Sequence, residues 1–190
     1  MIPSSELILN ADGSIYHLNL LPEDIAHKII LVGDPDRVTS VSAHFDTIRV
    51  RKNKREFVTH TGSYRGKDIT VLSTGIGTDN IDIVLNELDA LVNVDLNARE
   101  IKKEKTSLEI IRIGTSGSIQ EDVVVDSFLV SDFAIGMDGL MNFYDYNYQA
   151  EEEALMILYS NHMLDYGIHF ASPYCFRSAD DLRVKFSDFQ

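Results

Sequence analysis

A short apolar run that ends in a loop of small residues is the feature that most constrains the fold of this chain. Residues 108–113, Leu-Glu-Ile-Ile-Arg-Ile, are rich in β-branched side chains and too few for helical periodicity, which predicts a strand buried in a parallel sheet. Arg112 interrupts this run, and residues 114–117, Gly-Thr-Ser-Gly, follow with backbone N–H groups and hydroxyls that can bind an anion. Open α/β sheets bind ligands at this end of their strands. The alternative is an ion-paired Arg112 beside a simple tight turn.

The first buried strand predicted along the chain ends in a similar way. Residues 28–32 are apolar after the first position and run directly into Gly33. Pro35, with acidic neighbours, is a helix-start signal, and it leaves Arg37 in the first turn of the predicted helix. A strand, a glycine turn and a helix N-terminus in this order present backbone donors to an anion.

The same arrangement occurs a third time after a predicted β-hairpin. Residues 57–64 and 68–73 flank a glycine turn and are predicted to be the two strands of the hairpin. The glycine-rich loop 74–78 follows the second strand. The apolar spacing from Asp79 onwards is helical. Strands alternating with helices predict an α/β fold with a mixed central sheet. Further elements are expected as strands at 46–50, at 126–131 and from 168 to 171, and as a helix at 151–166, with no closing helix after residue 172.

Composition excludes several classes of function. The 190 residues are 44% hydrophobic and fit a single domain over residues 1–190, while the net charge of −13 argues against a nucleic-acid or anionic-membrane surface. The single cysteine, Cys175, excludes an internal disulfide. No apolar run approaches the roughly 20 residues of a membrane span, and the first residues lack a signal-peptide pattern. We therefore expect a cytoplasmic protein whose bound anion is small.

Four segments together resemble one known family. They are residues 32–38 (Val-Gly-Asp-Pro-Asp-Arg-Val), 55–57 (Arg-Glu-Phe), 73–77 (Ser-Thr-Gly-Ile-Gly) and 112–120 (Arg-Ile-Gly-Thr-Ser-Gly-Ser-Ile-Gln). In order and spacing they are similar to nucleoside phosphorylases of the uridine phosphorylase and hexameric purine nucleoside phosphorylase type. The resemblance implies a central, partly barrel-like mixed sheet flanked by helices, and dimers assembling as a trimer of dimers. It also implies phosphate-dependent cleavage of a nucleoside, uridine as a first guess, to a base and a pentose 1-phosphate.

The resemblance assigns a phosphate site and a ribose contact. The positions that match the phosphate-binding residues of the family are Gly33, Arg37, Arg112 and Thr115. Arg55 matches an arginine that reaches the phosphate of the neighbouring subunit, and His17 matches a histidine that a neighbour contributes to the ribose 5'-hydroxyl. Guanidinium groups suit this role because they form charge-assisted, often bidentate bonds with phosphate.

A potassium ion and the base are the remaining assignments. Glu56 and Ile76 match positions around a potassium ion between subunits in some uridine phosphorylases, but Asn80 stands where a serine is usual. No other cofactor is implied. The uridine phosphorylases bind the pyrimidine through a Phe-x-x-x-Gln-x-Arg segment. Aligned on Phe176, this chain lacks the glutamine and the arginine of that segment. Only Phe176 is therefore assigned to the base, and the preference for purine or pyrimidine stays open.

The resemblance fades towards Gln190, before a Met-Glu-x-Glu motif that holds the ribose hydroxyls in the family and before its last strand and helix. Three functions therefore compete. The chain is a nucleoside phosphorylase, a non-catalytic phosphate- or nucleoside-binding relative or truncated inactive form, or a nucleosidase of the same fold. Phosphate-binding arginines favour the first over the third, because a hydrolase has little use for them. We expect the 190-residue chain to bind phosphate and to show little phosphorolysis.

Overall fold

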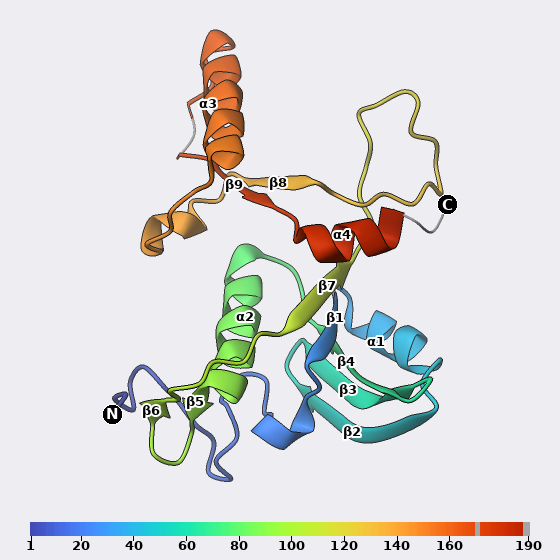
Figure 1. Ribbon diagram of the computed structural model, residues 1–190, viewed down its shortest axis with the longest axis vertical. Coiled ribbons are helices and arrows are strands. Elements are labelled where there is room, and N and C mark those ends of the chain that lie inside the picture. Colours follow the sequence, from blue (N-terminus) through green and yellow to red (C-terminus); the bar gives the residue numbers. More distant parts are fainter. Residues whose placement is uncertain (170–171, 188–190) are drawn as a thin grey trace. The chain divides into compact units, whose positions relative to one another are not determined.

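The structure is a computed structural model that describes residues 1–169 and 172–187. The chain divides into two compact units, Met1–Ser116 and Gly117–Gln190. In Figure 1 the first unit runs from blue to yellow-green and the second from yellow to red. The expectation of a single domain over residues 1–190 stays a prediction.

A five-stranded mixed sheet forms the centre of the first unit, as the alternation of strands and helices predicted. In spatial order its strands are β2 (Thr47–Lys54), β3 (Phe57–Tyr64), β4 (Lys67–Ser73), β1 (Lys28–Val32) and β7 (Glu109–Ile113). β2, β3 and β4 are antiparallel neighbours, whereas β1 is parallel to both β4 and β7. The α/β class with a mixed central sheet is therefore confirmed, and the barrel-like closure stays a prediction.

The register of the parallel strands brings their ends together. Val32, the last residue of β1, pairs with Ser73, the last residue of β4, and with Ile113, the last residue of β7. Because the three strands run in the same direction and end on the same rung, the loops that follow them begin side by side. This rung places the three glycine loops of the sequence at one edge of the sheet.

Helix α1 (Pro35–Ser42) covers one face of this sheet. It begins where the sequence predicted, because the Asp34 carboxylate accepts a hydrogen bond from the N–H of Asp36 at 2.9 Å and Pro35 occupies the first helical position. The fully buried Val38 packs with Val32 and Val71 of the sheet.

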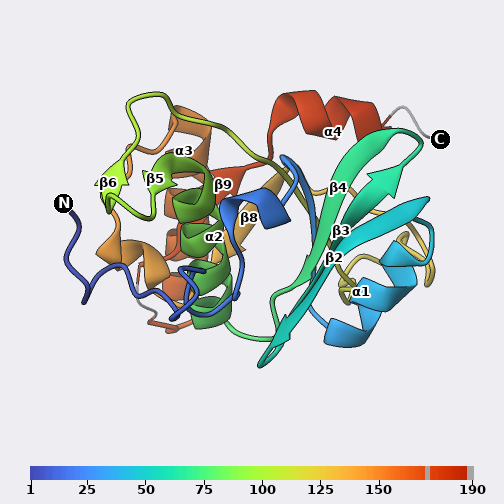
Figure 2. The ribbon, with the colours of Figure 1, turned by 90° about the horizontal axis from the view of Figure 1, so that it is seen from below.

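Helix α2 (Thr78–Asn93) covers the opposite face, and Figure 2 shows the sheet between the two helices. Its Val84, Leu88 and Leu91 are fully buried, and their spacing of four and three residues places them on one side of the helix. They pack with Ile29 and Leu31 of β1 in the main hydrophobic core. The smaller elements of this unit are η1 (Pro22–Asp24), β5 (Val94–Asp95) and β6 (Glu100–Ile101).

The second unit is built around an antiparallel pair of strands and one long helix. Strand β8 (Phe133–Gly136) is antiparallel to β9 (Tyr174–Arg177), and α3 (Ala150–Asp165) packs against β9. The Glu152 carboxylate, 2% exposed, accepts hydrogen bonds from the backbone N–H of Gln149 at 2.8 Å and of Arg177 at 2.9 Å. It thereby caps α3 and ties it to β9. The short η2 (Leu140–Phe143) and α4 (Asp180–Ser187) complete this unit.

Several expectations for the second unit are wrong. Residues 126–131 are not a strand; the strand begins later, at Phe133. This segment is apolar, but Phe128, Leu129 and Val130 are exposed, so its composition indicated β propensity without the partner strand that a ladder needs. Residues 168 and 169 are not in a strand, and the rest of the strand expected there falls on residues outside those described. The closing helix α4 was not expected.

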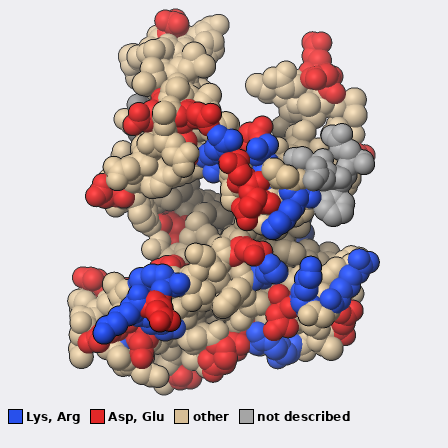
Figure 3. Space-filling view, viewed as in Figure 1, with Lys and Arg blue, Asp and Glu red and all other residues tan. Residues whose placement is uncertain are grey.

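The surface is mixed in charge. On the face shown in Figure 3, acidic and basic side chains are interspersed in both units, and no continuous basic field covers either one there. None of the helices in the described part of the chain combines the length and the apolar character that crossing a bilayer requires.

Candidate functional site

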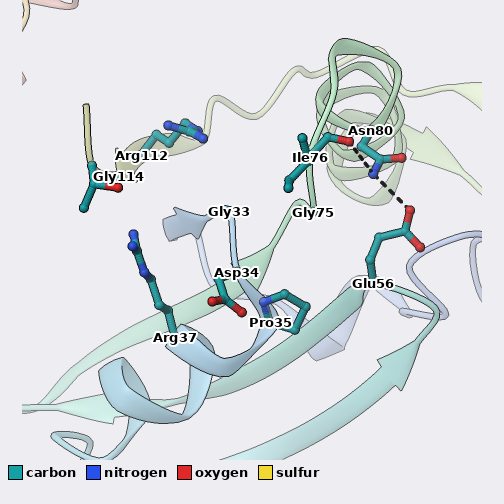
Figure 4. A pocket seen from close by; sticks show the side chains of 11 residues that line it. Gly33, Asp34, Pro35, Arg37, Glu56, Gly75, Ile76, Asn80, Arg112 and Gly114 are labelled. Atoms are coloured by element: carbon teal, nitrogen blue, oxygen red, sulfur yellow. Dashed lines mark hydrogen bonds between the residues drawn. The ribbon is translucent and has the colours of Figure 1, made fainter. Parts of the chain in front are cut away.

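A pocket of about 630 Å³ lies in the first unit, where the parallel strands end (Figure 4). The loops after β1, β4 and β7 contribute Gly33, Gly75 and Gly114 to its wall. The same loops also contribute Asp34, Ile76 and Thr115. The remaining lining residues come from the first turns of α1 and α2, the turn between β2 and β3, and the end of β7, and they are Pro35, Arg37, Asn80, Glu56 and Arg112. The shared rung of the sheet thus produces the pocket.

Arg37 and Arg112 reach this pocket from opposite faces of the sheet. Arg112 pairs with Leu31 in the ladder, so its side chain starts on the face that α2 covers, whereas Arg37 belongs to α1 on the other face. Both side chains nevertheless line one cavity, because it lies beyond the strand ends. Within residues 1–169 and 172–187, neither arginine has an ion pair or a side-chain hydrogen bond to a protein group. Two guanidinium groups that have no partner among the described protein groups favour an anion in this pocket.

Gly114 leaves room for the guanidinium group of Arg112, which also approaches Gly33 at an ordinary contact distance. Its Nη1 atom lies 2.7 Å from the position that a Cβ atom of Gly114 would take, so a larger residue there would collide with the guanidinium group. Its Nη2 atom lies 3.6 Å from the corresponding position at Gly33. Gly33, Arg37, Arg112 and Thr115 are the residues that the sequence assigned to phosphate within one chain, and the structure brings all four to this pocket. Their role in binding phosphate stays a prediction.

The residues assigned to potassium lie together in the same pocket, but their hydrogen bonds do not fit a cation. The Asn80 amide nitrogen donates to Glu56 Oε1 at 2.9 Å and to the Ile76 carbonyl oxygen at 3.2 Å. The amide donor thus occupies the two oxygens that the resemblance assigns to the cation, and an NH₂ group is not a cation ligand. In the part of the chain that the structure describes, there is also no cluster of His, Cys, Asp and Glu suited to a metal ion.

The two residues assigned to a neighbouring subunit lie outside this pocket. Arg55 is exposed in the turn between β2 and β3, where its φ of 57° is left-handed. His17 Nδ1 is 2.7 Å from Glu87 Oε1, and the same carboxylate accepts the backbone N–H of His17 at 2.9 Å and of Leu18 at 2.8 Å. Neither residue therefore completes the pocket from within its own chain.

Glu87 is a residue that sequence reasoning missed. It lies on α2, 70 positions from His17, and no local pattern connects the two. Because the carboxylate also holds two backbone N–H groups, it fixes the position of the His17 ring as well as its orientation. The ring keeps 27% of its side-chain surface exposed, so it remains accessible from outside.

Phe176, assigned to the base, lies in the second unit among other aromatic rings. Its ring centroid is 4.9 Å from that of Tyr146, in an edge-on arrangement, and 5.7 Å from that of Tyr174. Burial, with a smaller contribution from the hydrogen bond to Asp138, raises the pKa of Tyr174 to about 12. Phe176 thus packs against neighbouring aromatic rings, and its contact with a base stays a prediction.

Comparison with known proteins gives consistent matches. Residues 27–184 match the model of the Phosphorylase superfamily. A uridine phosphorylase of Thermococcus kodakarensis is 33% identical over 136 residues, which cover 72% of this chain and 44% of that protein. A DeoD-type purine nucleoside phosphorylase of Streptococcus suis is 33% identical over 127 residues, covering 66% and 48% of the two chains.

A solved structure is similar over nearly the whole chain. The nucleoside phosphorylase of Trypanosoma brucei, described as showing uridine phosphorylase activity, superposes with a TM-score of 0.81 at 30% sequence identity. The match covers 96% of this chain and 61% of that one. The chain spans less than half the length of the curated relatives it matches.

Proposed function

The chain belongs to the phosphorylase superfamily, and from that premise we propose that its pocket binds the phosphate with which a nucleoside phosphorylase cleaves a nucleoside. The observation that supports this most directly is that Arg37 and Arg112 line one cavity without a protein partner among the described residues. A phosphate ion supplies the negative charge and the several acceptor oxygens that two guanidinium groups can bind.

The chemistry we propose is a substitution at the sugar. A phosphate oxygen bonds to the anomeric carbon, the glycosidic C–N bond breaks, and its electron pair leaves with the base. The transition state has oxocarbenium character, so an anion held beside the sugar both stabilises the developing positive charge and forms the new bond. Arg37 and Arg112 fix the phosphate, the Gly33 and Gly114 loops allow it to approach the backbone, and the Thr115 hydroxyl adds a further donor.

The substrate and the assembly are part of this proposal. We take uridine as the first nucleoside to test because relatives named as uridine phosphorylases match. Inosine follows because a relative named as a purine nucleoside phosphorylase matches as well. We propose that Arg55 and His17 act in the site of a second copy of the chain, with Arg55 at the phosphate and His17 at the ribose 5'-hydroxyl. Two observations support this: Arg55 is exposed in its turn, and Glu87 holds His17 with part of its ring accessible. Phe176 is proposed to face the base.

Titration with inorganic phosphate tests the pocket without requiring turnover. Arg112→Ala removes a charge-assisted contact and should weaken phosphate binding by about 1.5–3 kcal/mol, or roughly 10- to 150-fold, in calorimetry. Arg112→Lys keeps the charge but loses the planar guanidinium group, so its phosphate affinity should lie between those of the wild type and Arg112→Ala. Lys103→Ala removes one positive charge from an exposed site outside the pocket and serves as the control. Equal phosphate affinity in wild type and Arg112→Ala would reject the assignment.

The reaction is then measured as release of free base from uridine, inosine and their deoxy forms, with and without phosphate. Turnover that depends on phosphate, together with formation of the pentose 1-phosphate, supports a phosphorylase. Base release at the same rate in the absence of phosphate would identify a nucleosidase instead. Phosphate binding without any release would identify a binding protein.

A further inference from the structure

The contact between Glu56, Ile76 and Asn80 joins two loops through a single amide group. Glu56 belongs to the turn between β2 and β3, Ile76 to the loop after β4, and Asn80 to the first turn of α2. The Asn80 nitrogen is 2.9 Å from the Glu56 carboxylate and 3.2 Å from the Ile76 carbonyl oxygen. Because a carboxylate and a backbone carbonyl are both acceptors, the nitrogen of the amide must face them, and not its oxygen.

The surroundings hold these groups in place. Gly75 has a φ of 68°, and a Cβ atom there would lie 2.8 Å from both the Asn80 amide nitrogen and Glu56 Cγ. The Glu56 backbone carbonyl accepts a hydrogen bond from the Ser73 hydroxyl at 2.6 Å, and that hydroxyl oxygen accepts the N–H of Val58 at 2.8 Å. The turn, the glycine and the amide are thus packed as one unit, with the carboxylate directed at Asn80 (Figure 4).

We propose that the Asn80 amide occupies the position that a monovalent cation would take between the Glu56 carboxylate and the Ile76 carbonyl, so that these loops hold together without potassium. The two N–H bonds of one amide point at two different oxygens, which is the cross-link that a cation provides by coordination. A cation at this point would have to displace the nitrogen and break both hydrogen bonds. The amide is neutral, so the carboxylate keeps its negative charge beside the pocket.

This inference goes beyond the proposed function, because it concerns how the loops are held and involves neither phosphate nor nucleoside. Failure of the phosphate experiments would leave it standing. Its failure would likewise leave the two arginines of the pocket unaffected.

Thermal unfolding in potassium chloride and in choline chloride, at equal ionic strength, tests the proposal. The wild-type midpoint should be the same in both salts. Asn80→Ser replaces the two amide N–H donors with one hydroxyl, whose oxygen can also bind a cation, so its midpoint should fall by about 2–4 °C in choline and recover, saturably, with potassium. Asn80→Ala also removes both donors but supplies no oxygen, and its midpoint should fall without recovery.

Two results would overturn the proposal. One is a saturable, potassium-specific rise of the wild-type midpoint that Glu56→Gln abolishes, since the amide would then not replace the ion. The other is an Asn80→Ser variant that responds to potassium no more than Asn80→Ala does, since these oxygens would then not form a cation position at all.

A direct titration decides the matter if the serine variant does not fold in choline. Calorimetry with thallium(I), which binds as potassium does, should show no saturable heat in the wild type. A saturable heat that is absent in Glu56→Gln would contradict the proposal. A wild type that binds no thallium(I) and unfolds identically in both salts would support it.

Discussion

Nearly every buried apolar side chain that the structure describes belongs to the unit Met1–Ser116, whereas in Gly117–Gln190 the buried side chains are Cys175 and Glu152. In the first unit, alternate residues of β1 face α1 and α2, so burial of apolar surface holds both helices to the sheet. In the second unit, a carboxylate that accepts two backbone hydrogen bonds holds a strand to a helix.

This difference indicates that the positions of the backbone are held more firmly in the first unit than in the second. Many small packing contacts fix the first unit, and they fix the strand ends that form the pocket. The second unit has few buried side chains, and two of its polar contacts depend on the single carboxylate of Glu152. The two units should therefore respond separately to mutation and to acid.

The largest effect is expected for Leu88→Ala in α2. Removing a fully buried side chain leaves a cavity and should lower the free energy of unfolding of the first unit by about 2–5 kcal/mol. Hydrogen exchange followed by mass spectrometry should show faster exchange in β1 and β4 and no change in α3. The matched control is Leu158→Ala in α3, whose side chain is 67% exposed and whose effect should stay within about 0.5 kcal/mol. Faster exchange throughout both units would show that they unfold together.

A smaller and more local effect is expected for Glu152→Gln. The amide oxygen of glutamine can replace one carboxylate acceptor but not both, so the N–H of either Gln149 or Arg177 loses its partner. Exchange at the Arg177 amide should accelerate while that of the first unit stays the same. Glu153→Gln changes the exposed neighbour by the same atoms and should have no effect. An unchanged Arg177 amide would mean that other contacts hold β9 to α3.

Acid should distinguish the units by the pH at which each loses stability. Burial, reinforced by the charge of Arg51, lowers the pKa of His60 below its ordinary 6.5. The unfolded chain therefore takes up a proton near pH 6.5 that the folded unit does not, and the stability of the first unit falls as the pH drops below that value. Hydrogen bonds from Gln149 and Arg177 lower the pKa of Glu152 below 4.5, so the second unit loses stability only below that pH.

The measurement is the exchange rate of each unit between pH 7 and pH 3, corrected for intrinsic rates. His60→Gln should remove the loss of stability near pH 6.5 from the first unit and leave the second unchanged. Should both units lose stability in one common window, the separation of their electrostatics would be refuted.

The sequence predicted the parts of the fold that local patterns determine. β1 and the strands of the hairpin lie where a continuous apolar run and a glycine turn placed them, and α1 begins at Pro35 as expected. These predictions are confirmed because turn residues, caps and periodicity act over a few positions. The apolar segment at 126–131 misled for the same reason: composition indicates a preference, but a strand needs a partner.

The contacts that local patterns do not determine needed the structure. Arg112 and Arg37 start on opposite faces of the sheet, and only the shared ends of the strands bring them to one pocket. Asn80 is 24 positions from the carboxylate it contacts, and Glu87 is 70 positions from His17. A single sequence carries no signal for pairs at such separations, because their meeting depends on how the helices pack on the sheet.

The paired residues Val32, Ser73 and Ile113 also determine how far apart the three loops begin. Neighbouring strands lie about 4.8 Å apart, so the loops after β4 and β7 start roughly 10 Å from each other, with the Gly33 loop midway. Substitutions within the loops can change which groups face the cavity. The width of the cavity, however, is set by the spacing between the strands. A one-residue insertion in β7 has a different result, since it turns Arg112 to the other face of the sheet. The loops are thus open to variation in chemistry, whereas a change in the length of a strand changes which side chains face the pocket.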